Sequence, residues 1–219
     1  KIDNKMNKTS KIVFLLKQAA ENATIYRSLF NWEVYFHCAN LSGKALDLAS
    51  GEKPSYHNFL PKDLKLTRTN YKPEKVEVVM DFNKPFPFKE EEFDHVLFFN
   101  AIYIADRPVE TLKEIRRVLK SDGTMIMSAP FITNEMPEPH DFWRFTQDGL
   151  KRILDEAGFR EYKIIRFGGR FSSALYLVNP AIPFAVLKMI FYPLVVLLDK
   201  LVPASALPAP LGYLVIASK

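Results

Sequence analysis

One loop in the second half of the chain gathers three side chains that are suited to acid–base chemistry. His140, Asp141 and Arg144 lie within five residues of one another, just before a helix that Thr146 is expected to cap. Histidine titrates near neutral pH and suits a general base, a neighbouring Asp can fix its tautomer, and an Arg can anchor an anion. A second interpretation stays open, in which Asp141 pairs with Arg144 and the group forms only a network at the helix entry.

The elements that would position this loop alternate along the chain. After Ser42-Gly43, short apolar runs predict strands at 45–49, 64–69, 76–80, 93–99, 125–128, 162–167 and 212–218. Helices are predicted within 11–37, at 108–120 with Asp122-Gly123 as its stop, and at 146–157 with Gly158 as its C-cap. Alternating strands and helices predict a parallel sheet that binds ligands at the carboxyl ends of its strands.

The first predicted strand runs directly into a tight turn, which reads Asp47-Leu48-Ala49-Ser50-Gly51-Glu52-Lys53-Pro54. This turn resembles the glycine-rich loop of class I S-adenosylmethionine-dependent methyltransferases, hydrophobic-x-D-x-G-x-G-x-G. In that family the glycines let the backbone approach the methionyl part of the cofactor, and the Asp helps to fix the loop and the amino group. Gly51 keeps the middle glycine, whereas Ala49 replaces the first and Lys53 the third.

Further motifs extend the resemblance over roughly residues 44–170. Phe93-Asp94-His95-Val96-Leu97 and the later run from Leu112 to Thr124 are similar to the FDxVL and LxEIxRVLKPGG segments of the methyltransferase type 11 family. The stretch from Glu138 to Thr146 closely resembles the E-P-H-D-F-x-R-[YF]-T segment of a bacterial subgroup. That subgroup also carries residues like Lys53-Pro54-Ser55-Tyr56 after the glycine loop.

The resemblance implies S-adenosylmethionine as cofactor and a set of residues to bind it. Asn70 stands where the family has the acid that holds both ribose hydroxyls, and Asp81 where an Asp binds the adenine amino group. Phe82 would pack on the adenine ring, and Asn100 would line the site from the end of the fourth strand. The implied cofactor-binding residues are Asp47, Ala49, Ser50, Gly51, Asn70, Asp81, Phe82 and Asn100.

Several departures from the family pattern leave a second hypothesis open. Asn70 lacks the charge of a carboxylate, so weaker cofactor affinity is expected. The family's Glu-His pair is missing from Ile102-Tyr103-Ile104-Ala105, Asp81 could be a turn residue before Asn83, and Asn100 could be a polar strand end. The alternative is therefore a catalytically degenerate protein of the same fold that acts as a binding or scaffold partner.

Composition narrows the classes of protein and of partner. The chain has 219 residues, 48% of them hydrophobic and 25% charged, which excludes a disordered, collagenous or coiled-coil protein. Cys38 is the only cysteine, so no internal disulfide or C-x-x-C zinc site can form, no metal is expected, and a reducing compartment is favoured. No signal-peptide pattern is evident, and the expected location is the cytoplasm, at most at the inner membrane surface.

Basic residues concentrate in the two end regions of the chain, without a nucleic-acid-reading motif, so a nucleic-acid partner is not expected. Between Phe171 and Leu198 the only charged residue is Lys188, and three prolines interrupt the apolar run. This run is too broken to predict a membrane span. Three interpretations remain, namely a buried cap over the site, a dimer face, or docking on a membrane surface.

The sequence thus predicts one α/β architecture, a Rossmann-like seven-stranded and mostly parallel sheet with an antiparallel last strand and helices on both faces. Residues 1–43 would form an N-terminal helical extension, and 44–219 a methyltransferase domain with an apolar insertion at about 171–210. The expected activity is S-adenosylmethionine-dependent methyl transfer to a small-molecule, glycan or lipid acceptor, with His140, Asp141 and Arg144 as catalytic candidates.

Overall fold

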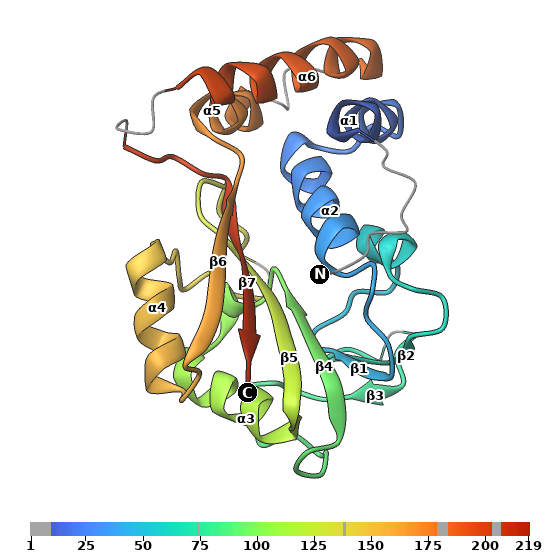
Figure 1. Cartoon of the computed structure of the whole chain (residues 1–219), viewed down its shortest axis with the longest axis vertical. Helices are drawn as coiled ribbons and strands as arrows, with labels where there is room; N and C mark the ends of the chain where they lie inside the picture. Colours follow the sequence, from blue (N-terminus) through green and yellow to red (C-terminus); the bar gives the residue numbers. More distant parts are fainter. Residues whose placement is uncertain (1–9, 74, 138, 179–183, 203–206) are drawn as a thin grey trace.

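Seven strands form one sheet in the order β3-β2-β1-β4-β5-β7-β6 (Figure 1). The computed structural model describes residues 10–73, 75–137, 139–178, 184–202 and 207–219. The strands are β1 Lys44–Asp47, β2 Lys65–Asn70, β3 Val78–Val79, β4 Phe93–Phe99, β5 Leu119–Pro130, β6 Glu161–Phe167 and β7 Gly212–Ser218. Only β7 runs antiparallel to its two neighbours, and the other pairs are parallel, so the predicted fold class is confirmed.

The helices are α1 Lys11–Ala20, α2 Ile25–His37, α3 Pro108–Val118, α4 Gln147–Glu156, α5 Arg170–Val178 and α6 Ala185–Leu201, with short 3-10 turns at Ser55–Phe59 (η1) and Ile102–Ile104 (η2). Helix α2 covers one face of the sheet, and α3 and α4 cover the other. The Thr146 side chain accepts from Gly149 N, and Gly158 adopts a φ of +93°. The predicted N-cap is therefore confirmed, whereas the C-cap is Ala157 and Gly158 follows it in the left-handed conformation.

The predicted end of the preceding helix is wrong by two residues. Helix α3 stops at Val118, and β5 begins at once with Leu119, so Asp122-Gly123 lies within the strand. Phe93 pairs with Leu119 but His95 pairs with Thr124, so β5 bulges between these pairs. A Cβ on Gly123 would lie 2.9 Å from the Lys120 carbonyl oxygen, so this glycine serves the bulge and not a helix stop.

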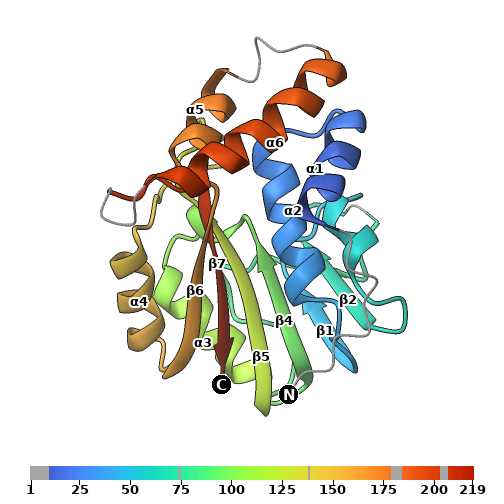
Figure 2. The same ribbon diagram turned by 45° about the horizontal axis from the view of Figure 1, so that its top comes forward.

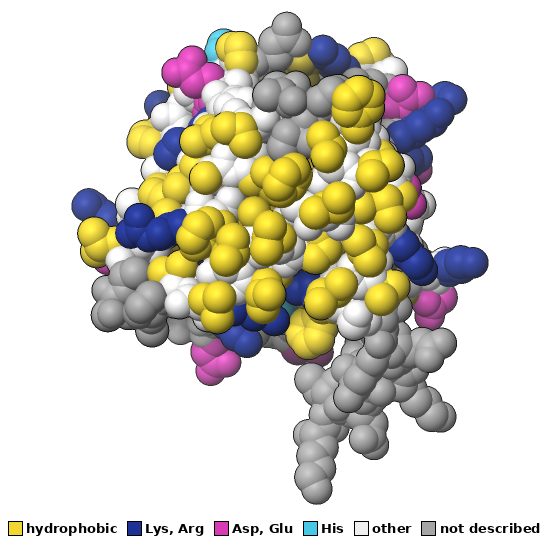
Figure 3. Space-filling view, turned by 90° about the horizontal axis from the view of Figure 1, so that it is seen from above, with side chains coloured by type: hydrophobic (Ala, Val, Ile, Leu, Met, Phe, Trp, Pro, Cys, Tyr) yellow, Lys and Arg dark blue, Asp and Glu magenta, His cyan; other side chains and the backbone are white. Residues whose placement is uncertain are grey.

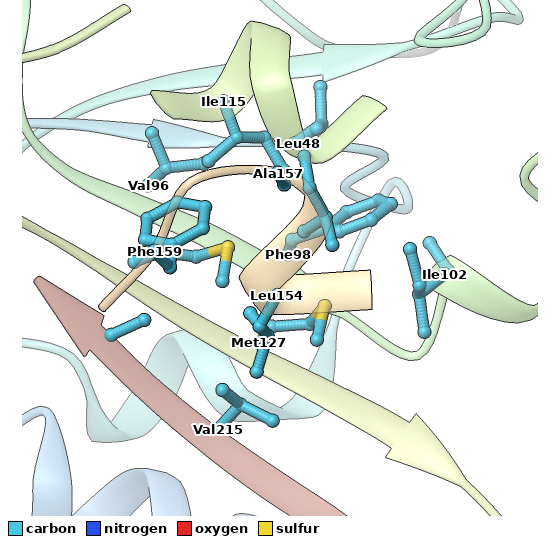
Figure 4. Close-up of a cluster of buried hydrophobic side chains, with 14 of the residues drawn as sticks. Leu48, Val96, Phe98, Ile102, Ile115, Met127, Leu154, Ala157, Phe159 and Val215 are labelled. Carbon is cyan, nitrogen blue, oxygen red and sulfur yellow. The ribbon is translucent and has the colours of Figure 1, made fainter. Parts of the chain in front are cut away.

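Side chains of the central strands alternate between two hydrophobic cores. On one face, Val96 and Phe98 of β4, with Met127 and Val215 of β5 and β7, pack against α3 and α4 (Figure 4). On the other face, Leu97, Phe99, Ile126 and Leu214 pack with α2, and Cys38 is buried among them. This two-sided burial explains why the sequence shows continuous apolar runs instead of alternation.

Helices α1, α5 and α6 form a separate layer, here named the cap helices, beyond one end of the sheet (Figure 2). Helix α5 follows β6 after only two residues, so this layer lies at the carboxyl ends of the parallel strands. Helix α6 packs along α1 and across α5. The division at residue 43 and the apolar insertion at about 171–210 stay predictions; most of α5 and all of α6 lie within that range.

In the described part of the chain, no helix is both long and apolar enough to cross a membrane. Within the same residues, no three His, Cys, Asp or Glu side chains gather so that they could hold a metal ion.

Candidate active site

Two neighbouring cavities open at the carboxyl ends of the central strands. Ala49, Asn100 and Tyr103 contribute to the walls of both. The first, here named the Asp81 cavity, measures about 610 Å³ and is also lined by Asn70, Tyr71, Asp81, Phe82, Asn83, Ala101, Ile104, Asp106, Pro139 and His140. The second, the Lys53 cavity, measures about 550 Å³, and its other charged or hydroxyl-bearing residues are Thr24, Tyr26, Arg27, Glu52, Lys53, Ser55, Tyr56, Thr133 and Tyr176. Both volumes are typical of small-ligand sites.

The loop after β1 forms the wall between these cavities and the sheet. Ala49 adopts a φ of +60°, the left-handed region that glycine favours, and costs about 1 kcal/mol relative to an unstrained residue. Ser50 is fully buried, and its backbone N–H donates to the Thr69 carbonyl oxygen at 2.8 Å. A Cβ built on Gly51 meets no atom within 4 Å, so Gly51 presents bare backbone to open space in the Lys53 cavity.

Asp47 is fully buried beneath this loop, and η1 supplies its partners. The Tyr56 hydroxyl donates to its carboxylate at 2.9 Å and 3.1 Å, and His57 Nε2 lies 2.7 Å from Oδ2. These contacts join the end of β1 to the residues that follow the glycine loop, so they fix both ends of the loop. Asp47 lines neither cavity and acts here through the loop.

Asn70 at the end of β2 also holds the loop. Its Nδ2 donates to the Ser50 carbonyl oxygen at 3.0 Å, and its Oδ1 accepts from Tyr71 N at 2.7 Å. A carboxylate at this position could not make the first of these bonds, because it has no donor. The amide therefore has a structural use that the acid of the family pattern would not serve.

Asp81 and Phe82 border the Asp81 cavity from the segment after β3. Asp81 Oδ1 accepts from Asn83 N at 3.0 Å, as the turn interpretation predicts, and its side chain remains 41% exposed at the cavity. The Phe82 ring is 9% exposed and packs edge-on against Phe98 at 5.3 Å. Most of the Phe82 ring is thus committed to the core, which leaves only its edge for a ligand.

Asn100 joins the two cavities at the end of β4. It adopts a φ of +51°, and its Oδ1 accepts from the Tyr26 hydroxyl at 2.6 Å and from Ser128 Oγ at 3.0 Å. Because two donors occupy that oxygen, the amide N–H₂ group is the part of Asn100 suited to a ligand acceptor.

Of the three catalytic candidates, Asp141 and Arg144 bind each other, whereas His140 contacts Phe142. Arg144 forms a double hydrogen bond with Asp141, and Asp141 Oδ2 also accepts from Met136 N at 2.8 Å. The prediction that Asp141 orients His140 is wrong, because both carboxylate oxygens serve Arg144 and the loop backbone; the network interpretation describes this pair. His140 is exposed, stacks on Phe142 at 5.1 Å and reaches the Asp81 cavity.

Sequence reasoning missed several residues of the Lys53 cavity. Tyr26 and Arg27 come from α2, and Tyr176 comes from α5, where the sequence shows only helical periodicity and no sign of a site. Thr133 follows β5, and its Oγ1 is buried without a hydrogen-bond partner within the described residues. The one available signal was the Lys53-Pro54-Ser55-Tyr56 motif, which contains the Asp47 partner.

The tyrosines of the site are held in their neutral form. Burial raises the pKa of Tyr56 well above its usual range, and the charge of Asp47 adds to this effect. Burial likewise raises the pKa of Tyr26 and of Tyr103. These hydroxyls therefore act as hydrogen-bond donors near neutral pH and not as general bases.

Part of the chain matches a family model of known proteins. Residues 36–127 match the family model described as a methyltransferase domain, of type 11. This part of the chain is thus similar to a methyltransferase domain. The match spans the glycine loop, Asn70, Asp81 and Asn100. This match and the solved structures described next confirm the predicted resemblance and the predicted cofactor class.

Solved structures of methyltransferases share the whole fold. An S-adenosylmethionine-dependent methyltransferase from Archaeoglobus fulgidus is 17% identical, with a TM-score of 0.60 over 93% of this chain and 98% of that one. A Burkholderia thailandensis 1,6-didemethyltoxoflavin-N1-methyltransferase, solved with its substrate and S-adenosylhomocysteine, is 14% identical, with a TM-score of 0.54 over 94% and 83% of the two chains.

Among curated proteins, an uncharacterised protein of Methanocaldococcus jannaschii is 27% identical over 99 residues, or 40% of this chain. The match covers 48% of that relative, so the chain spans about half its length.

Proposed function

We propose that this methyltransferase-domain protein transfers a methyl group from S-adenosylmethionine to a small-molecule, glycan or lipid acceptor. The observation that carries the proposal is the pair of joined cavities, with polar strand ends in one and the bare backbone of Gly51 in the other. When bound, S-adenosylmethionine supplies an electrophilic methyl group on a sulfonium.

The Asp81 cavity and the Lys53 cavity, which share Ala49, fit the two halves of such a cofactor. Asp81 offers a partly exposed carboxylate that can accept from an amino group, as an adenine would require. Gly51 allows close approach to its backbone, and Lys53, which lines the same cavity, can supply a counter-charge to a carboxylate. Methyl transfer needs little covalent help from the protein, so holding the acceptor in line within a dry pocket is the main task.

His140 is proposed as the base for an acceptor hydroxyl, because it is exposed at a cavity wall and an imidazole nitrogen can accept a proton. Replacing His140 by Ala is expected to lower turnover by about 10²-fold or more while leaving cofactor affinity within about twofold of the parent. Turnover would be measured once an acceptor is known, and an unchanged rate would remove the base role.

Cofactor binding is the first test of the proposal. Calorimetric titration of the full chain with S-adenosylhomocysteine is expected to show one site in the micromolar range, about −8 kcal/mol. The ligand is also expected to raise the unfolding temperature, because it binds only the folded state.

Absence of binding at millimolar ligand would contradict methyl transfer and favour the alternative, a non-catalytic scaffold or binding partner. Cooperative thermal unfolding of the same protein, with and without ligand, would show that the absence of a binding signal is not caused by misfolding. If S-adenosylhomocysteine binds, the next experiment is a screen for the methyl acceptor among glycans, lipids and small hydroxylated molecules.

A further inference from the structure

Exposed hydrophobic side chains cover the outer surface of the cap helices (Figure 3). Along α6 the residues Val186, Ile190, Leu194, Leu197 and Leu201 recur at helical spacing, and between 43% and 70% of each side chain is exposed. Their neighbours on α1 and α5 include Ile12, Val13, Leu177 and Val178, which are also exposed. A continuous apolar surface of this extent on a monomer usually marks an interface.

The polar groups of α6 that face inward show how this surface is built. Lys188 is 5% exposed, and its Nζ lies 2.7 Å from Asn22 Oδ1 in the α1–α2 turn. The Asp199 carboxylate accepts from Ser172 Oγ at 2.5 Å and from Phe171 N at 2.8 Å. Lys188 and Asp199 are thus satisfied inside the protein, and the exposed residues of α6 are mainly hydrophobic.

The same contacts hold α6 parallel to the surface. Tyr192 is fully buried, and its hydroxyl donates to the Ala23 carbonyl oxygen at 2.7 Å. Lys188 and Asp199 fasten the helix to α1 and α5 at separate points, so α6 cannot turn outward without breaking buried polar contacts. Its apolar face can therefore lie on a partner but cannot insert across one.

Charge decides which partner fits this face. The cap helices contain Lys11, Lys17, Arg170, Lys188 and Lys200, against Asp199 as their single acidic residue. Lys17, Arg170 and Lys200 of these helices are exposed. A second copy of the chain, related by a two-fold axis, would bring these like charges together, whereas an anionic lipid surface complements them.

We propose that the cap helices dock flat on an anionic lipid bilayer, with the α6 stripe buried at the level of the acyl chains and headgroups. Tyr176 of α5 lines the Lys53 cavity, and Leu177 and Val178 beside it are exposed on the cap. Docking therefore places the Lys53 cavity within reach of an acceptor carried in the lipid, and this last step alone rests on the proposed methyl transfer.

Vesicle flotation of the full chain tests the docking. The protein is expected to float with phosphatidylcholine vesicles that contain phosphatidylglycerol, and to float less in high salt or with phosphatidylcholine alone. Leu194→Glu with Leu197→Glu is expected to lower the bound fraction about tenfold or more, because two exposed aliphatic groups of the docking face become charged. Phe36→Glu, a change of the same kind at an exposed residue of α2 outside the cap, should float like the parent.

A second variant guards against failure of the first to fold. Lys17→Glu with Lys200→Glu leaves the apolar stripe intact and is expected to weaken flotation with anionic vesicles only. Titration with S-adenosylhomocysteine on the same preparations separates this proposal from methyl transfer, since neither variant touches the cavities. A parent protein that stays out of the vesicle fraction overturns the docking, and a dimer in light scattering that Leu194→Glu with Leu197→Glu dissociates assigns the face to a second copy.

Discussion

Replacing Asp47 by Ala is expected to lower the free energy of unfolding by about 3–5 kcal/mol, the largest loss of stability that we foresee for one polar residue. Asp47 is fully buried, its two carboxylate oxygens share the hydrogen bond from the Tyr56 hydroxyl, and His57 Nε2 lies 2.7 Å from its Oδ2. Its removal leaves a buried hydroxyl and a half-buried imidazole without their acceptor, and it releases both ends of the glycine loop. Denaturant unfolding, read at an unchanged m-value, measures the loss.

Tyr56→Phe provides the matched control for this contact. It keeps the ring in the core and removes one donor, so a loss of about 1–3 kcal/mol is expected. The double variant should lose less than the sum of the two single changes, because Asp47→Ala has already removed the partner of the hydroxyl. Additive losses would show that Asp47 and Tyr56 contribute independently, contrary to the geometry.

The same tyrosine gives the contact a pH dependence with a definite sign. Because burial raises the pKa of Tyr56, the folded protein keeps its proton at a pH where the unfolded chain, near pH 10, releases it. Stability is therefore complete below about pH 10 and falls as the pH rises above it, by about 1.4 kcal/mol per pH unit for each such tyrosine. Tyr56→Phe should make this alkaline decline less steep.

The sheet and its family were predictable because they depend on patterns that act locally. Continuous apolar runs, Thr146 before α4 and Gly158 after it determine element type without knowledge of the tertiary structure. The bulge in β5 was not predictable, since Asp-Gly favours a stop in isolation and only the pairing with β4 draws Gly123 into the strand. At Asp122-Gly123 the pairing of β5 with β4 therefore determines the structure, and the local turn propensity does not.

The site was only partly predictable, for a related reason. Asn70 and Ala49 look like losses when they are compared with a motif, yet the structure gives the amide a bond to Ser50 and lets Ala49 hold a glycine-like φ. Asp141 could bind either His140 or Arg144 by spacing alone, and only the fold of the loop decides in favour of Arg144. Contacts between elements that are distant in sequence, such as Tyr26 with Asn100, produce no local sequence pattern from which they could be predicted.

Replacing Asp81 by Ala is expected to weaken S-adenosylhomocysteine binding by about 10- to 100-fold, the largest effect on affinity that we foresee for one side chain. The carboxylate borders the Asp81 cavity and remains partly exposed there, and a hydrogen bond to a charged group contributes about 1.5–3 kcal/mol. Calorimetry with the full chain measures the change. Asp63→Ala, which removes an exposed carboxylate outside both cavities, should bind like the parent.

Asp81 also holds a turn, so the alanine variant alone would confound two effects. Asp81→Asn separates them, because the amide oxygen can still accept from Asn83 N and keep the turn, while the charge at the cavity is lost. Weaker binding in both variants, with unchanged unfolding of Asp81→Asn, would place the carboxylate on the ligand. Parent-like affinity in Asp81→Asn together with loss in Asp81→Ala would instead show that Asp81 supports the site only through the turn.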